Sequence, residues 1–188
     1  MPSRHRKTRP APPHLWLMTD ERVPDVRLIA AVRRLPRGAG IVFRHYALAE
    51  DRRRALFDRL ARLARVRDVT LLLADTPARA RQWGADGWHG PAASARGKEY
   101  RLHSMAVHDA RELRAARRAN ADLLFISPVH PTHSHPDAAT LGPRGLLRLA
   151  RKAQAPVIAL GGMTALRARP PMRAGIHGWA AIDALTRV

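Results

Sequence analysis

Two adjacent glycines near the end of the chain, Gly161 and Gly162, have the sequence setting of an anion-binding turn. They follow the apolar run APVIAL at 155–160 and precede a helix-length segment at 164–173. A turn from strand to helix offers free backbone N–H groups, and glycine lets a phosphate approach them closely. The alternative is a tight turn that needs a positive φ and binds nothing. We expect a phosphate here, because loops after the late strands of parallel barrels often bind one.

Two charged residues, Arg44 and Asp75, directly follow short apolar runs that are typical of strands. Arg44 could clamp an anion with two parallel N–H donors, or it could form a surface ion pair. Asp75 could ligate a metal ion, or it could cap a helix that begins near Pro77. We expect Arg44 to bind an anion, and both interpretations of Asp75 stay open. His89 and His108 are expected to be structural histidines.

A proline-rich segment, HPTHSHP at 130–136, brings three histidines and two hydroxyl residues together. His130, His133 and His135 could face a phosphate as cations, hold a transition metal, or lie in a solvated loop. Their spacing, H-x-x-H-x-H, matches no common zinc pattern. Thr132 and Ser134 lie between them and could donate hydroxyl hydrogen bonds to the same anion.

The chain has 188 residues, no cysteine and a net charge of +19. This length suits one domain, and the lack of cysteine excludes a disulfide framework. The charge favours anionic partners, but arginines scattered through helical segments and 5% aromatic residues disfavour a nucleic acid as the main ligand. No apolar run approaches the roughly 20 residues of a membrane span, and the basic start lacks the apolar core of a secretory signal. We expect a cytoplasmic protein with a disordered basic tail over 1–13 and a single domain over 14–188.

Short apolar runs alternate with amphipathic segments along the chain, and this pattern predicts parallel βαβ units. Strands are expected at 15–19, 41–43, 69–74, within 84–89, and at 102–107, 121–127, 156–160 and 178–182. Helices are expected at 25–35, 50–67, 77–83, 109–118 and 143–153, whereas Pro170 and Pro171 should break the helix that follows Gly162. Eight such units predict a small α/β protein of the (β/α)₈ TIM barrel class with a truncated C-terminal helix after Leu185. The alternative is an open doubly wound sheet, but LWLMTDERVP contains none of the glycines expected after its first strand.

Several motifs occur in a distinctive order: LWLMTD at 15–20, VFRHY at 42–46, LLLAD at 71–75, GADGWHG at 84–90, VHDARELRAARRANADLLFISPVHPTHS at 107–134, APVIALGGM at 155–163 and AGIHGWAAIDAL at 174–185. No single motif is specific. GADG-x-H-G, a P-T-x-S loop and P-V-x-A-L-G-G-M in that order are fairly specific together. In this order the chain resembles the thiamine phosphate synthase family and its relatives, the TenI-type thiazole tautomerases.

The resemblance implies a barrel enzyme that joins a pyrimidine pyrophosphate to a thiazole phosphate and releases pyrophosphate with Mg²⁺. The small phosphorylated substrates would be its partners. Asp75 would help to hold Mg²⁺, and Gly161 with Gly162 would bind the thiazole phosphate. The resemblance implies that four residues bind the pyrophosphate: Arg44, Thr132, Ser134 and His135. Arg44 and His135 would also act in catalysis.

The chain departs from the family pattern at several of the positions that would bind substrate or metal. The segment 91–94 reads Pro-Ala-Ala-Ser and lacks the family's second metal carboxylate. Asp183 replaces a serine, and its carboxylate would repel a phosphate if it pointed inward. The other replaced positions, where the family has glutamine, lysine, asparagine and serine, are Val42, Tyr46, Ala74 and Ala106.

These departures motivate two further hypotheses beside the synthase. One is a catalytically degenerate or TenI-like member that binds a thiazole or phosphate ligand, although the tautomerase histidine two residues after Phe125 is not present. The other is a basic protein that binds nucleic acid or a membrane surface. A homodimer stays open.

Overall fold

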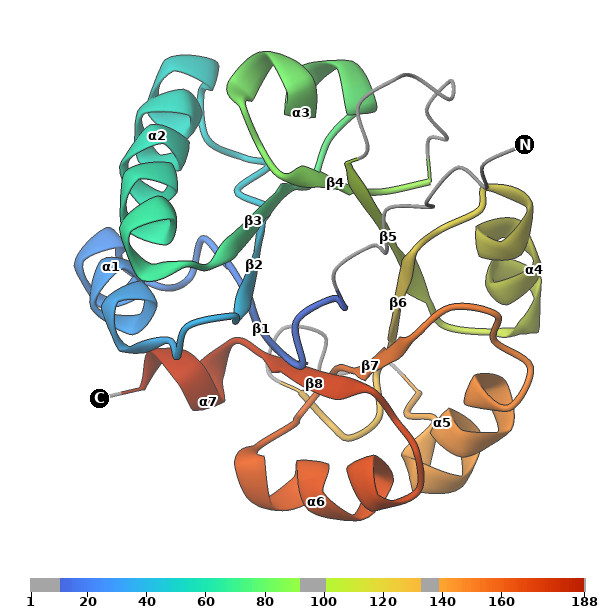
Figure 1. Ribbon diagram of the computed structural model, residues 1–188. Coiled ribbons are helices and arrows are strands. Elements are labelled where there is room, and N and C mark those ends of the chain that lie inside the picture. The colour runs from blue at the N-terminus through green and yellow to red at the C-terminus, as the bar shows by residue number, and fades with distance from the viewer. Residues whose placement is uncertain (1–10, 92–100, 133–138, 188) are drawn as a thin grey trace, which may run out of the picture.

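The computed structural model describes residues 11–91, 101–132 and 139–187. Within these segments, eight parallel strands pair in sequence order and the last pairs with the first, which closes a barrel. Helices surround this ring of strands on the outside (Figure 1). The predicted (β/α)₈ barrel is therefore confirmed, and the open doubly wound sheet is excluded.

The elements follow the predicted alternation closely. The strands are β1 (Leu15–Met18), β2 (Gly40–Phe43), β3 (Thr70–Leu73), β4 (Gly87–His89), β5 (Leu102–Val107), β6 (Leu123–Ile126), β7 (Val157–Ala159) and β8 (Gly178–Ala181). The helices are α1 (Asp25–Arg34), α2 (Glu50–Arg67), α3 (Pro77–Trp83), α4 (Ala110–Arg118), α5 (Gly142–Ala150), α6 (Ala165–Arg173) and α7 (Asp183–Thr186). The predicted bounds are within two residues of these, except that α5 ends three residues earlier than expected.

The interior of the barrel is filled by side chains that alternate along the strands with those facing the helices. Trp16 and Met18 of β1 lie inside, whereas Leu17 packs outward with the helices, as a period of two requires. The Trp16 ring meets Phe125 of β6 edge-on, with 5.5 Å between ring centroids. A side chain at Gly40 would place its Cβ 2.3 Å from the Trp16 ring. Glycine is therefore needed at the start of β2 to admit the indole.

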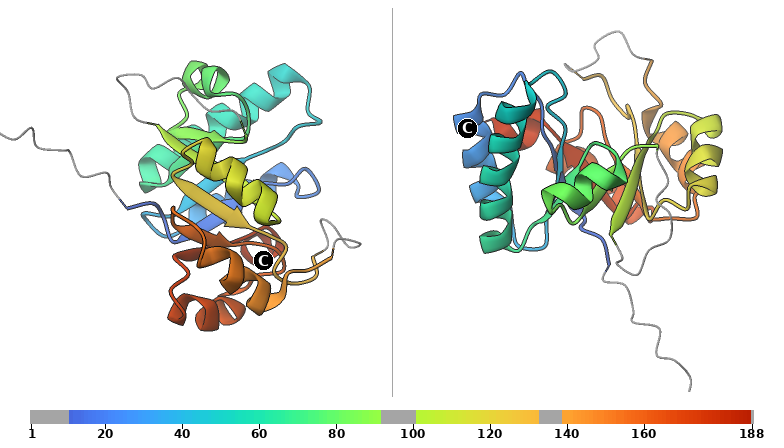
Figure 2. Two further views of the ribbon diagram at one scale, coloured as in Figure 1. Left: turned by 90° about the vertical axis from the view of Figure 1, so that its right-hand side faces the viewer. Right: turned by 90° about the horizontal axis from the view of Figure 1, so that it is seen from above.

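The helices cover the barrel with their apolar faces. On α2 the buried residues include Leu56, Phe57 and Leu60, while most of its arginines face solvent. The four-residue α7 lies beside α1 (Figures 1 and 2), and Arg27 donates a hydrogen bond of 3.3 Å to the carbonyl of Thr186. The short C-terminal helix is thus confirmed, although it begins at Asp183 and not after Leu185. None of the helices in the described segments has the length and apolar character needed to cross a bilayer.

The prediction that Pro170 and Pro171 break the helix after the glycine pair is wrong, because α6 continues through both to Arg173. Each proline removes one backbone donor from the helix. The Thr164 hydroxyl caps the first turn by accepting a hydrogen bond from the Arg167 N–H at 3.2 Å. Pro171 itself is buried, so its packing against the barrel helps to offset the missing hydrogen bonds.

Candidate phosphate-binding active site

A cavity of about 540 Å³ lies at the C-terminal ends of the strands, which is the end of a TIM barrel where active sites form. Met18 comes from β1, His89 from β4 and Ala106 from β5, while Ser127 follows β6 and Ala181 ends β8. Residues from the ends of β2 and β7 also line it. Among the described lining residues, none comes from the end of β3. The volume suits a small organic ligand.

Arg44 lines this cavity, and Thr19 binds both its backbone and its side chain. Thr19 Oγ1 accepts a hydrogen bond of 2.9 Å from the Arg44 backbone N–H, and the Thr19 carbonyl accepts one of 2.7 Å from Arg44 Nε. Arg44 Nη2 also donates to Asp20 Oδ2 at 3.1 Å. A guanidinium group has five N–H donors, so several stay available for an anion. The structure therefore combines both interpretations of Arg44, an ion pair and a cation facing the cavity.

Asp20 fixes a second arginine at the same edge. Arg22 donates from Nε to Asp20 Oδ1 at 2.9 Å and from Nη2 to Oδ2 at 3.1 Å. Burial alone would raise the pKa of Asp20, but the hydrogen bonds from Arg22 and the charges of Arg22 and Arg44 outweigh it and lower the pKa. Asp20 is therefore anionic near neutral pH and orients two guanidinium groups.

The charge of the cavity wall is predominantly positive. Asp183 is the one acidic residue among the described lining residues, and its Oδ2 lies 3.8 Å from Arg187 Nη2. This carboxylate lies at the cavity, as the sequence-based concern about phosphate repulsion supposed. The lining cations are four arginines: Arg22, Arg44, Arg167 and Arg187.

Gly161 and Gly162 line the cavity and also make the close packing of two loops possible. Their φ angles are +95° and +59°, in the region that favours glycine. A Cβ on Gly162 would lie 2.4 Å from the Pro131 carbonyl oxygen, and one on Gly161 would lie 2.7 Å from Pro128 Cα. The His130 N–H donates to the Gly161 carbonyl at 3.1 Å. The tight turn that needs no ligand thus accounts for both glycines, and their place at the cavity leaves them open to a phosphate.

The remaining predicted anion ligands belong to the loop after β6. Thr132 lines the cavity together with Arg44 and the two glycines, whereas the positions of His133, Ser134 and His135 lie outside the described residues. His130 is not among the lining residues. Burial, and then the charge of Arg167, lower its pKa, which disfavours the protonated form that a phosphate contact would use.

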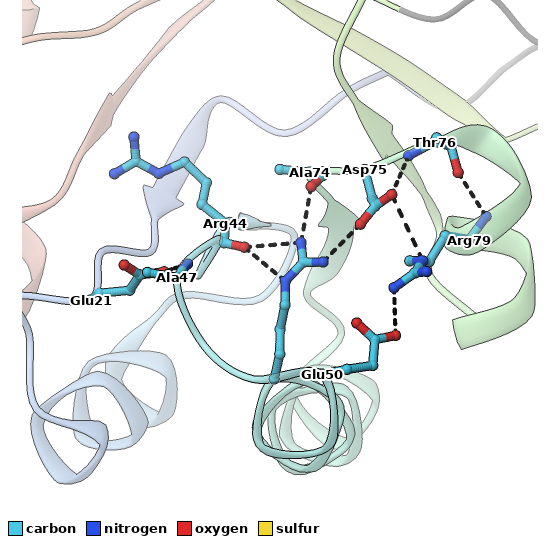
Figure 3. A network of polar contacts seen from close by, with 9 residues as sticks. Glu21, Arg44, Ala47, Glu50, Ala74, Asp75, Thr76 and Arg79 are labelled. Carbon is cyan, nitrogen blue, oxygen red and sulfur yellow. Dashed lines mark hydrogen bonds and ion pairs between the residues drawn. The ribbon is translucent and has the colours of Figure 1, made fainter.

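Asp75 is not among the described lining residues, and it is paired with Arg53 of α2. Figure 3 shows Asp75 in its network of polar contacts with Thr76. Arg53 Nη1 donates to Asp75 Oδ2 at 2.7 Å, and the Thr76 N–H donates to Oδ1 at 2.7 Å. Burial raises the pKa of Asp75, but the hydrogen bond from Arg53 and the neighbouring positive charges outweigh it and lower the pKa. The helix-cap interpretation of Asp75 is wrong, because the Thr76 hydroxyl caps α3 by accepting from Arg79 N at 3.2 Å.

These contacts of Asp75 do not fit the metal-ligand role that the family resemblance implies for it. Both of its oxygens are engaged by N–H donors, and Arg79 Nε lies 3.9 Å from Oδ1. Within the described segments, no three histidine, aspartate or glutamate side chains come close enough to hold a metal ion. Magnesium requires several oxygen ligands in octahedral geometry, so the residues that the structure describes do not fit a Mg²⁺ ion held by side chains alone.

His89 and His108 line the cavity, although the sequence favoured a structural role for both. His89 is 9% exposed and its Nδ1 lies 2.9 Å from Ser104 Oγ. Burial, followed by the charges of Arg44 and His103, lowers the pKa of His89 to about 3, so the ring is neutral near pH 7. The sequence signal for His89 is its place at the end of the strand expected within GADGWHG, which is β4 in the structure.

Other lining residues had no distinguishing signal. Arg22, Arg167 and Arg187 are three arginines in a chain with 34 lysines and arginines, and nothing in their local sequence sets them apart. Of the positions that depart from the family pattern, Tyr46, Ala106 and Asp183 line the cavity. Val42 and Ala74 are instead buried in the barrel interior.

The closed barrel and the arginine-lined cavity at its strand ends define a TIM-barrel protein suited to an anionic ligand. Residues 15–185 match the family model described as thiamine monophosphate synthase. The chain belongs to this family.

Curated relatives are similar along much of the chain. A thiamine-phosphate synthase of Chlorobium limicola is 32% identical over 95% of this chain and 88% of its own length. One of Geobacillus thermodenitrificans is 31% identical, and that match covers 74% of this chain and 66%, just under two thirds, of the relative. A solved structure of thiamine phosphate pyrophosphorylase from Pyrococcus furiosus has a TM-score of 0.76 at 23% identity, covering 93% of this chain and 87% of that one. The likeness to this solved structure supports the TIM-barrel fold of the chain.

Proposed function

We propose that the chain is a thiamine phosphate synthase-type transferase that acts in thiamine biosynthesis. It would join hydroxymethylpyrimidine pyrophosphate to thiazole phosphate and release pyrophosphate. The observation that carries the proposal is the arrangement of Arg44 and the Gly161–Gly162 turn around one cavity, in a chain that matches the family over 15–185. Anionic groups of the two substrates could thereby be held in the same cavity.

In the proposed reaction the thiazole nitrogen attacks the methylene carbon of the pyrimidine. A C–N bond forms while the C–O bond to pyrophosphate breaks, and the leaving oxygen takes the electron pair. Negative charge therefore grows on the pyrophosphate, and Arg44 with Arg22 would stabilise it as oriented cations. The backbone around Gly161 and Gly162 would hold the phosphate of the thiazole.

The loop after β6 would complete the pyrophosphate site. Thr132 lines the cavity and its hydroxyl would donate to the pyrophosphate, and Ser134 and His135 stay predictions from the family motif. Mg²⁺ also stays an expectation taken from the resemblance, and no step of this proposal depends on it. A cytoplasmic location and a homodimer stay predictions of the sequence.

The second candidate is a family member that binds the phosphorylated ligands without turnover. It is motivated by the pairing of Asp75 with Arg53 and by the carboxylate of Asp183 at the cavity. Both candidates predict binding of a thiazole phosphate, and only the first predicts formation of thiamine phosphate.

The test is a product assay with both substrates, in the presence and absence of Mg²⁺. Formation of thiamine phosphate supports the transferase, and Arg44→Gln should lower the rate while Arg62→Gln, an exposed position on α2, should not. Saturable binding of thiazole phosphate with no product supports the binder. Absence of both binding and product contradicts both candidates.

A further inference from the structure

The Arg53–Asp75 pair occupies the place where the family resemblance puts a metal ligand. Arg53 is buried, with 6% of its surface exposed. Its guanidinium donates to Asp75 Oδ2 at 2.7 Å, to the Ala74 carbonyl at 3.0 Å and twice to the Arg44 carbonyl, at 3.2 and 3.0 Å. Arg44 directly follows β2 and Ala74 directly follows β3, so these contacts bridge the ends of the two strands; Figure 3 labels Arg44, Ala74 and Asp75.

Aromatic rings also surround the guanidinium, which makes its position fixed. The Arg53 Cζ atom lies 5.9 Å from the ring centroids of Phe43 and Tyr46 and 5.4 Å from that of Trp83. Arginine does not lose its proton in proteins. Taking Asp75 away from it would leave a buried positive charge without its counter-ion, which is strongly unfavourable. The pair is therefore expected to persist when a ligand enters the cavity.

The carboxylates described at or beside the cavity do not replace Asp75 as metal ligands. The segment 91–94 contains no acidic residue, and Asp20 is already bound by Arg22 and Arg44. Asp183 is the one acid among the described residues that line the cavity, and Arg187 lies beside it. The cavity wall instead presents several guanidinium groups, which bind phosphate oxygens in a bidentate manner.

We propose that Arg53 permanently neutralises the carboxylate at the end of β3, and that the cavity binds an organic pyrophosphate through Arg22 and Arg44 without a divalent cation held by the protein. The ligand class rests on the proposed function. Arg53 does not line the cavity, so its role is to hold the ends of β2 and β3 and to remove the negative charge of Asp75. The arginines at the wall bind the anion.

The test uses inorganic pyrophosphate as the probe and calorimetry on the full chain. Binding should be saturable in excess EDTA, and Mg²⁺ should tighten it by less than about threefold. Asp75→Asn should keep the affinity within about threefold, whereas Arg44→Gln should weaken it about tenfold or more. Titration with Mn²⁺ alone, followed by electron paramagnetic resonance, should show no bound ion in the wild type.

Several results would overturn the inference. These are pyrophosphate binding that requires Mg²⁺, no pyrophosphate binding in either condition, or a Mn²⁺ site that Asp75→Asn removes. The wild-type measurements in EDTA and with Mn²⁺ decide the matter even if a variant fails to fold. Failure of the transferase proposal is separate: metal-free binding of pyrophosphate without product contradicts the activity alone. Product that forms only with Mg²⁺, together with Mn²⁺ binding at Asp75, contradicts this inference alone.

Discussion

Thr19 holds Arg44 through two of its oxygens, with its hydroxyl 2.9 Å from the Arg44 backbone nitrogen and its carbonyl 2.7 Å from Arg44 Nε. Because Thr19 is fully buried at the end of β1, this contact fixes the direction of the guanidinium.

We expect Arg44→Gln to weaken binding of pyrophosphate by about 10- to 100-fold, which is the contribution of hydrogen bonds to a charged group. Thr19→Val keeps the charge and loses one anchor, so it should weaken binding by about three- to tenfold. Calorimetry measures both; equal affinity in Arg44→Gln and wild type would remove Arg44 from the site.

The Arg53–Asp75 pair predicts a loss of stability in acid. The pKa of Asp75 is lower in the folded state, so its stabilisation is present above the unfolded value of about 3.9 and is lost as the pH falls through the folded value. Asp75→Asn should cost about 2 kcal/mol at pH 7, and the cost should shrink below about pH 4. Urea unfolding at several pH values measures this.

The control for Asp75 is Asp58→Asn on α2. Asp58 accepts a hydrogen bond from Arg54 at 2.9 Å, but both side chains are more than a third exposed. Its loss should cost less than about 0.5 kcal/mol at pH 7. Equal losses of unfolding free energy in Asp75→Asn and Asp58→Asn would show that the buried pair stabilises the fold no more than the exposed pair.

His89 predicts a second pH dependence, in a different range. Its folded pKa of about 3 lies below the unfolded value of about 6.5, so the unfolded chain binds a proton that the folded protein does not. Protonation of His89 in the unfolded chain should therefore lower the free energy of unfolding by about 2 kcal/mol as the pH falls from 6.5 to 5. His89→Asn should flatten that slope, as measured by denaturant unfolding. By NMR, a His89 ring that titrates near pH 6.5 in the folded protein would contradict the prediction.

Gly162 and Gly38 form a matched pair for testing the turn after β7. Both have positive φ, +59° and +74°, but a Cβ at Gly38 meets nothing within 4 Å, whereas one at Gly162 meets the Pro131 carbonyl oxygen at 2.4 Å. Gly38→Ala should cost about 1–2 kcal/mol from backbone strain alone. Gly162→Ala should cost about 3 kcal/mol or more and weaken phosphate binding, because the loop that carries Thr132 must move. Unfolding and phosphate titrations measure both; equal effects would exclude the loop contact.

The barrel and its elements could be predicted from the sequence because the signals are local. The apolar run at β3 and the arginine-rich amphipathic pattern of α2 each occupy neighbouring residues. Asp109 stands directly before the amphipathic segment that forms α4 and so marks the start of that helix. In the structure Asp109 caps that helix by accepting from the Glu112 N–H at 2.8 Å. The Gly161–Gly162 turn was also found this way, since a strand followed by two glycines is a pattern within a few residues.

The partners of the charged groups could not be predicted in the same way. Asp75 looked like a metal ligand in its motif, yet its partner is Arg53, 22 residues away in sequence on α2. No local feature separates Arg53 from the other arginines of that helix. Likewise, the pKa of His89 is lowered by burial and by the charges of Arg44 and His103; Arg44 directly follows β2 and His103 lies in β5.

By itself, then, the order of apolar runs, helical periods and turn glycines determined a closed ring of parallel strands and the end at which its cavity lies. Only the folded chain decided which guanidinium groups face that cavity and which one neutralises Asp75. The reason is physical: strand and helix formation depends on neighbours along the chain, whereas ion pairing and desolvation depend on distances between atoms that folding alone brings together.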